Sequence, residues 1–164
     1  MPVSIRKLTL WRTEVDNRPG ALADVLEPIA AAGGDLHILM GYRVPGRTQR
    51  AIVELAPVIG RRLAQVAEKA GLAAGGAPTL LVGGDNRPGL ANRIARALAD
   101  SGVNIAFLVA QVVGRRYSAV FGFDSEADLD KAADRIRTAV TARPVGGRRT
   151  GSRKRASSAA RQPV

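Results

Sequence analysis

A motif of polar side chains, proline and glycine occurs twice in the chain, as Asp16 to Gly20 and as Asp85 to Gly89. The copies are identical, DNRPG, and lie 69 residues apart. Proline fixes φ, and glycine lets the backbone approach a bulky group. The free N–H groups of a following helix can bind a carboxylate, while aspartate and asparagine oxygens can accept hydrogen bonds from an ammonium group. The motif therefore predicts a pocket for an amino acid or a similar small zwitterion.

A purely structural turn fits the same residues. Aspartate and asparagine are common helix N-caps and turn residues, so each copy can form a capped tight turn that binds no ligand. Duplication copies structural turns as well as binding sites, so the repetition does not decide between the two interpretations.

The duplication extends well beyond the motif. The same offset of 69 residues maps Leu39 onto Leu108 and, without a gap, Ala64 onto Ala133. Each copy has the periodicity of strand, helix, strand, strand, helix. The strands are predicted over 5–15, 35–44 and 50–55 in the first copy and over 78–83, 104–113 and 118–123 in the second; helical spacing covers 22–29, 59–70, 90–98 and 126–140.

This order predicts an α+β fold of two tandem ferredoxin-like βαββα(β) units with antiparallel sheets. Few residues remain after the second helix of each copy, so the fourth strand is expected to be short or exchanged with the neighbouring copy. The predicted boundaries are 1–74 for the first unit and 77–142 for the second. Residues 143–164 are predicted to form a basic, disordered tail.

The second copy shows a family resemblance most clearly. An apolar strand, DNRPG-L, an amphipathic helix and the pattern Ala-x-x-Gly-x-Asn-Ile over 99–105 resemble the ACT domain. That family includes regulatory domains of phosphoglycerate dehydrogenase and aspartokinase. The resemblance covers 5–72 and 78–141. It implies a non-catalytic regulatory protein, with ligand bound at the interface between ACT units, between the duplicate halves of one chain or across a dimer.

The resemblance also implies which residues bind the ligand. The strand-to-helix turn of one unit meets the start of the second strand of its neighbour. By position, the ligand-binding residues would be Asp16, Asn17, Pro19, Gly20, Ala21, Leu22 and Asp35 in the first copy, and Asp85, Asn86, Pro88, Gly89, Leu90, Asn104 and Ile105 in the second. Because Asp35 stands where the second copy has Asn104, the two sites are expected to be unequal.

Composition argues against catalysis. The chain has no cysteine and one histidine, His37, so the usual pairs of nucleophile and base cannot be assembled. His37 is predicted to be a partly buried structural residue. The acidic stretch from Asp124 to Asp130 lacks the glycine and terminal glutamate of a calcium loop, and Ser125 with Asp128 instead predicts a capping box. No catalytic residue, metal or cofactor is expected.

The charge and the hydropathy of the chain limit which other classes of partner are expected. The net charge is +11, but seven basic residues and no acid fall within 143–164. This tail could bind nucleic acid weakly, although a solubilising terminus is the plainer interpretation. No apolar run is long enough to span a membrane, so a cytoplasmic protein is expected. The expected partners are a second copy of the chain and a regulated enzyme; a purely structural subunit is the other alternative.

Overall fold

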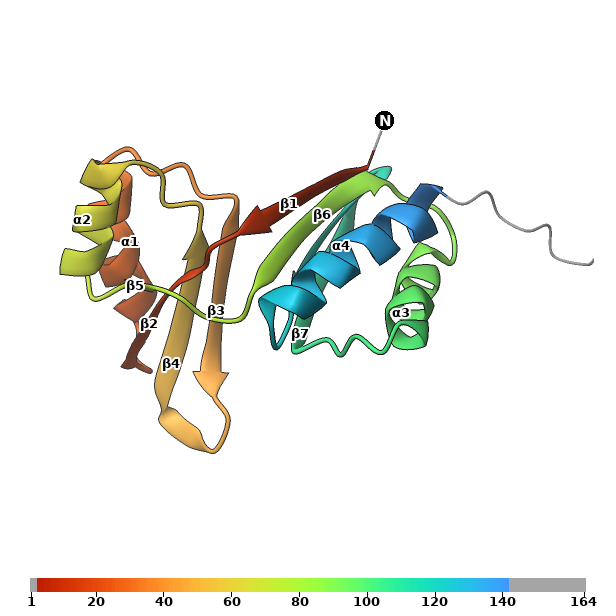
Figure 1. Ribbon diagram of the computed structural model, residues 1–164. Coiled ribbons are helices and arrows are strands. Elements are labelled where there is room, and N and C mark those ends of the chain that lie inside the picture. Colours follow the sequence, from red (N-terminus) through yellow and green to blue (C-terminus); the bar gives the residue numbers. More distant parts are fainter. Residues whose placement is uncertain (1–2, 142–164) are drawn as a thin grey trace, which may run out of the picture.

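The computed structural model describes residues 3–141 and shows two four-stranded antiparallel sheets, each with two helices on one face (Figure 1). This architecture confirms the predicted α+β, ferredoxin-like fold. The segment 143–164, for which a disordered tail is predicted, lies outside the described residues. Within the described part of the chain, no helix combines the length and hydropathy needed to cross a membrane.

The elements follow the duplicated order. The first unit contains β2 (Trp11–Asp16), α1 (Ala21–Ala31), β3 (Ile38–Val44), β4 (Arg47–Ala56), α2 (Arg61–Lys69) and β5 (Ala73–Ala74). The second contains β6 (Thr79–Asp85), α3 (Leu90–Asp100), β7 (Phe107–Val113), β8 (Arg116–Gly122) and α4 (Glu126–Thr141). One further strand, β1 (Ser4–Leu8), precedes both.

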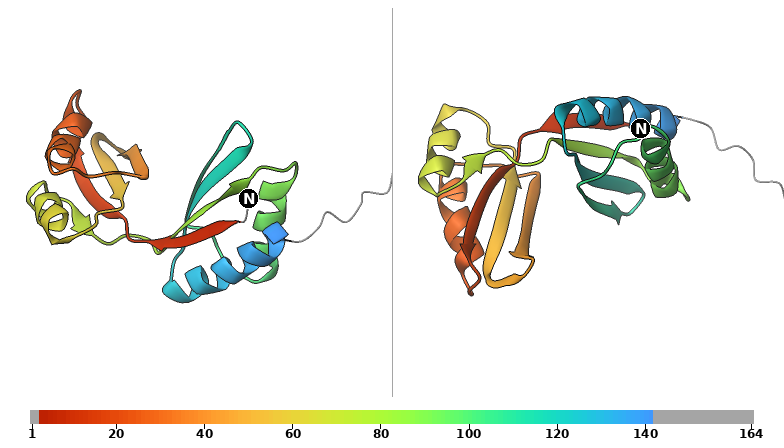
Figure 2. Two further views of the ribbon diagram at one scale, coloured as in Figure 1. Left: turned by 90° about the horizontal axis from the view of Figure 1, so that it is seen from above. Right: turned by 60° about the horizontal axis from the view of Figure 1, so that its bottom comes forward.

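The N-terminal strand β1 belongs to the second sheet. It pairs antiparallel with β6, with Ser4 opposite Gly83 and Leu8 opposite Thr79. The sheet orders are β3-β4-β2-β5 and β7-β8-β6-β1, so β1 occupies in the second unit the position that the short β5 occupies in the first. The single strand predicted over 5–15 is therefore two strands in two sheets, and β1 bridges the units (Figure 2). The prediction of a short or exchanged fourth strand is confirmed.

Each unit has its own apolar core between sheet and helices. Alternate strand residues face the helices, because successive side chains point to opposite faces of a sheet. Trp11, Val53 and Leu55 pack with Ile29 of α1 in the first core. The buried residues of the second core are Leu80, Val82, Leu90, Ile94, Leu98, Val103, Tyr117, Ala119, Phe121, Phe123, Leu129, Ala132, Ile136 and Val140. Half-buried Ile5 of β1 packs against this second core.

The two sheets meet through their helix-free faces. A small buried cluster joins Leu10, Ile38 and Ala56 of the first unit to Leu81 and Val120 of the second. Ile38 pairs with Ala56 at one end of the first sheet, whereas Asp16, the first residue of the DNRPG motif, pairs with Arg50 at the other. The junction therefore lies at the end of the first sheet away from its turn.

The hairpin of β3 and β4 carries extra residues relative to that of β7 and β8. In the first unit Val44 pairs with Arg47 but Arg43 pairs with Ala51, and this register shift marks a β-bulge. In the second unit Val112 pairs with Tyr117 without a shift. The constant offset of 69 residues between the two copies is thus wrong beyond this turn. Ala64 and Ala133 are therefore not shown to be equivalent positions of the two units. Tyr117 is equivalent to Ala51.

The acidic stretch before α4 is a helix cap, as predicted. The Asp128 N–H donates to Ser125 Oγ at 3.1 Å, and the Ser125 hydroxyl donates to Asp128 Oδ2 at 2.8 Å. This reciprocal pair fixes the first turn of α4 and uses the side chains that would otherwise suggest a cation site.

Candidate functional site: two cavities at the DNRPG turns

Both DNRPG turns end in a glycine that begins a helix. Gly20 has φ of 87° and Gly89 has φ of 77°, in the left-handed region that other residues adopt only with strain. Among the described residues, no side chain forms a capping hydrogen bond at the start of α1 or α3. The side-chain cap that the structural alternative predicts is therefore not found at either turn. The first N–H of each helix donates within its turn, from Ala21 to Arg18 O at 3.3 Å and from Leu90 to Arg87 O at 3.1 Å. The N–H groups that could bind a ligand are therefore those of the next residues, at Leu22 and Ala91.

The first turn borders a cavity of about 390 Å³. Its walls come from the end of β2, the first turn of α1 and the middle of β3 and β4. The lining residues are Val15, Asp16, Asn17, Arg18, Ala21, Leu22, Gly41, Tyr42, Arg43, Ala51, Ile52 and Val53. Three of these side chains carry a formal charge, so the cavity suits a polar or charged molecule.

Several polar groups at the first turn already bind one another. The Arg50 guanidinium pairs with Asp16 and donates from Nε to Glu14 Oε1 at 2.8 Å, which lowers the pKa of Glu14. Arg18 Nη2 lies 2.6 Å from Asp24 Oδ2, beside the start of α1. Asp16, predicted to accept a ligand ammonium group, thus has a guanidinium partner in the free protein.

The second turn borders a smaller cavity of about 210 Å³ between α3 and the sheet. Its lining residues are Asn86, Leu90, Ala91, Ile94, Ala95, Ile105, Leu108, Ala110, Gln111, Val112, Tyr117, Ala119 and Phe121. By position in the repeat, Ala110, Gln111 and Val112 correspond to the three β3 residues that line the first cavity. The two cavities are therefore equivalent sites of the duplicated unit.

Tyr117 distinguishes the second cavity from the first. Its side chain is only 8% exposed, and its hydroxyl has no hydrogen-bond partner within residues 3–141. Burial raises the pKa of Tyr117, so the hydroxyl is protonated at neutral pH and can donate a hydrogen bond. An unpaired buried hydroxyl is unfavourable, so a ligand that supplies a hydrogen-bond acceptor here would stabilise the folded protein.

The second cavity is polar at one end and apolar at the other. Tyr117 pairs in register with Gly84, next to the turn. Its side chain lies close over Gly84, because a Cβ atom at that position would be only 3.4 Å from the Tyr117 hydroxyl oxygen. Phe121 lies four residues farther along β8, roughly 13 Å at the usual rise of a strand. Ile105 and Leu108 line the cavity as well. The shape suits a small amphipathic molecule with its polar end at the turn.

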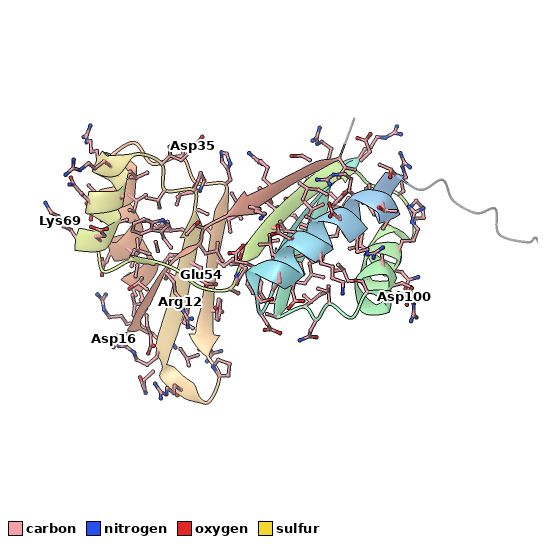
Figure 3. All side chains as sticks on the ribbon, in the orientation of Figure 1. Arg12, Asp16, Asp35, Glu54, Lys69 and Asp100 are labelled. Atoms are coloured by element: carbon pink, nitrogen blue, oxygen red, sulfur yellow. The ribbon has the colours of Figure 1, made fainter. Side chains whose placement is uncertain are left out.

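The predicted site residues fall into three groups. Those that line a cavity are Asp16, Asn17, Ala21, Leu22, Asn86, Leu90 and Ile105. Those that shape the turns or end a strand there, without lining a cavity, are Pro19, Gly20, Asp85, Pro88 and Gly89. Asp35 and Asn104 lie just before the second strand of their units; Figure 3 shows Asp35 and Asp16 at opposite ends of the first unit.

The residues at those far ends have partners of their own. Asn104 Nδ2 lies 3.4 Å from Asp124 Oδ2, and Asp35 lies 3.6 Å from His37 Nε2. His37 is exposed and precedes β3, so the prediction of a partly buried strand residue is wrong. Asp35 and Asn104 can contribute to a cavity only from a neighbouring unit.

The duplicate halves of one chain do not enclose either site. Each cavity is lined by residues of a single unit, and the cluster that joins the sheets lies elsewhere. The expectation of a ligand lodged between the halves of one chain is therefore not met. The reason is the strand exchange, which joins the units through β1 and their helix-free faces.

Two features of the first sheet are not apparent from the sequence motifs. Glu54 is only 5% exposed on the helix-free face of β4, and the Tyr42 hydroxyl donates to its Oε2 at 3.1 Å. Arg12, opposite Glu54 in register, lies close to it in Figure 3. Among residues 3–141 no group of three His, Asp or Glu side chains is placed to hold a metal ion.

Comparisons with known proteins agree with this architecture. Residues 78–140 match the ACT domain. No curated protein sequence is significantly similar to the chain. Protein BT0572 from Bacteroides thetaiotaomicron is similar in structure, with a TM-score of 0.66 and 16% identity over 81% of this chain and 88% of the other.

Two aspartate kinase structures are also similar. The ligand-free regulatory subunit from Thermus thermophilus has a TM-score of 0.57 and 17% identity, over 85% of this chain and 97% of the subunit. Aspartokinase III from E. coli, in complex with aspartate and ADP, has a TM-score of 0.53 and 11% identity, over 84% of this chain and 33% of the enzyme. At such identities the likeness establishes a shared fold. Residues 78–140 thus match the ACT domain, and the first unit repeats the order of strands and helices of the second.

Proposed function

We propose that this protein is a non-catalytic regulator that binds an amino acid at its DNRPG cavities and transmits the bound state to a partner enzyme. The observation that carries this proposal is the buried Tyr117 hydroxyl, which has no hydrogen-bond partner among residues 3–141, in a residue that lines the same cavity as the start of α3. The match to the ACT domain and the likeness to regulatory subunits of aspartate kinase support it. Regulation then requires that the ligand bind one arrangement of the units better than another.

The interface that completes each site is proposed to form with a second copy of the chain. Strands β3 and β7 lie at sheet edges, and β7 exposes Leu108, Val109, Val112 and Val113 by 48–70%. An exposed apolar edge strand is a ready surface for pairing with another strand. In antiparallel pairing of β7 with the β7 of a copy, the start of the copy's strand, with its Asn104, would come next to the turn at Asn86.

Amino acids are expected to raise the melting temperature of the free protein. Binding only to the folded state stabilises it by about 2.7 kcal/mol at a hundredfold excess over Kd. Thermal denaturation with each of the twenty amino acids at millimolar concentration measures this directly. The amino acids that do not bind serve as internal controls, and a melting temperature that is the same in all twenty would contradict the proposal.

Pairing of the β7 edges makes a separate prediction. Val109 is 50% exposed and lines neither cavity, so Val109→Lys places a charge on the edge without altering a binding site. We expect the variant to shift the protein from dimer to monomer, measured by light scattering during size exclusion. Ile59→Lys is the matched control, because Ile59 is 76% exposed and precedes α2. Equal masses for both variants and the parent would argue against this edge.

A further inference from the structure

We infer that the second cavity selects an amino acid with an apolar side chain, branched aliphatic or aromatic, and that the Tyr117 hydroxyl hydrogen-bonds to the polar end of that ligand. This inference rests on the proposed function and specifies the ligand class of one of its two sites. Three observations carry it: the size of the cavity, the chemistry of its lining, and the position of the unpaired hydroxyl.

The size fits a small apolar group. The cavity measures about 210 Å³. An apolar protein cavity of about 150 Å³ is already large enough to bind benzene. A branched aliphatic or phenyl side chain therefore fits between α3 and the sheet, beside Ile94 and Phe121.

The lining discriminates against a charged side chain. None of the described residues that line the second cavity carries a formal charge, whereas Asp16, Arg18 and Arg43 line the first. A charged ligand side chain would lose its hydration at the apolar end and find no partner there. An apolar side chain loses unfavourable contact with water at the same place, so the second cavity favours it.

The polar end of the ligand can form a hydrogen bond with Tyr117. Tyr117 is buried, and its hydroxyl lies over Gly84 beside the turn, where Asn86 also lines the cavity. An α-carboxylate at the start of α3 can accept from this hydroxyl and from the N–H of Ala91, since the Leu90 N–H already donates to Arg87 O. The helix N-terminus alone would not identify a ligand; the independent observation is the buried hydroxyl of Tyr117, a residue that lines the cavity, which has no hydrogen-bond partner among residues 3–141.

The first cavity is not expected to share this selectivity. The bulge between β3 and β4 puts Ala51 at the position of Tyr117, so the first site has no hydroxyl or ring at this position. Its tyrosine, Tyr42, is exposed, and its hydroxyl already donates to Glu54. The ligand that depends on Tyr117 is therefore expected to occupy one site per chain.

Tyr117→Phe tests the inference in the full-length protein. Isothermal titration with leucine, phenylalanine, aspartate and lysine gives the affinities. Removing one hydrogen bond to the ligand is expected to weaken the binding of leucine or phenylalanine about tenfold. Any affinity for aspartate or lysine should be unchanged, because it would belong to the first cavity. Ser101→Ala is the control: it removes a hydroxyl of the second unit that donates to Leu98 O and lies outside both cavities.

The outcomes separate the inference from the proposed function. Tyr117→Phe should keep or raise the melting temperature of the ligand-free protein, since it deletes an unpaired buried oxygen. Binding of leucine or phenylalanine with equal affinity to parent and variant would overturn the inference and leave the proposed function standing. The same holds if aspartate or lysine loses as much affinity as the apolar ligands. If the parent binds no amino acid, both the inference and the proposed function are wrong.

Discussion

Ile5→Asp is expected to destabilise the second unit by about 2 to 4 kcal/mol, although Ile5 lies at the opposite end of the sequence from most of that unit. Ile5 packs against the second core, and its strand supplies the fourth position of the second sheet. A carboxylate at this site must either be buried without a partner or pull β1 away from β6. In the first case the unpaired charge destabilises the core, and in the second the edge of β6 loses its cover.

Arg6→Asp is the matched control for this substitution. It introduces the same residue into the same strand, but Arg6 is exposed and points to the opposite face, so a change of roughly 0.5 kcal/mol or less is expected. Equal destabilisation by the two substitutions would show that β1 is not held against the second core.

The single tryptophan separates the two units in the same experiment. Trp11 is buried in the first core, so its fluorescence reports on the first unit, whereas far-ultraviolet circular dichroism reports on both. In Ile5→Asp the circular dichroism transition should move to lower urea concentration than the fluorescence transition. Coincident transitions would instead indicate that the small cluster between the sheets couples the units into one cooperative fold.

The strand exchange also bears on where the chain can be divided. The predicted units, 1–74 and 77–142, separate β1 from the sheet that it completes. A fragment beginning at residue 77 would lack its fourth strand and leave β6 as an open edge. No single cut in the sequence therefore separates the two units, because β1 precedes the first unit but belongs to the sheet of the second.

Much of the fold follows from periodicity alone. The spacing of apolar residues places both pairs of helices and the central strands, and Gly33 and Gly102 end their helices at φ of 79° and 72°, as predicted. The sheet to which β1 belongs cannot be predicted in this way, because the apolar pattern of a strand does not indicate which strand it pairs with. The one local signal is Leu10 next to Trp11: two consecutive buried residues break the alternation of the strand.

The candidate site could be located from the sequence but not characterised. The DNRPG motif identifies the turns, and seven of the residues named from it or from the family line a cavity. Tyr117 could not be found in this way, because the gapless offset aligns it with Thr48. A bulge is set by backbone pairing between strands, so its three-residue shift becomes visible only in the register.

The expectation of unequal sites rested on Asp35 and Asn104, and the structure offers a different basis for the inequality. Those two residues lie at the far ends of their units, outside both cavities. Within the cavities, two of the differences are Ala51 against Tyr117 and Arg43 against Val112. Unequal selectivity therefore stays a prediction, and it can be tested within one chain.

Ala110→Phe and Gly41→Phe are expected to abolish binding at the second and the first cavity respectively. The two positions are equivalent in the repeat, each lies on the second strand of its unit, and both are exposed, so a phenyl ring can enter the cavity from the edge. A Cβ built on Gly41 meets nothing within 4 Å. Because neither position is buried, the unliganded stability should change little, while crowding of the cavity should weaken binding by about 10- to 100-fold.

Each variant is the control for the other, since both place the same ring at the same position of a different unit. Titration with a ligand of the second cavity should show loss of binding in Ala110→Phe and parental affinity in Gly41→Phe. If both variants lose that ligand, the sites are coupled or the ligand contacts both units. If neither loses it, the molecule binds outside the cavities, and the DNRPG turns are structural corners. Because the chain carries two copies of one unit, this comparison holds the fold, the tail and the oligomeric state constant while only one cavity is filled.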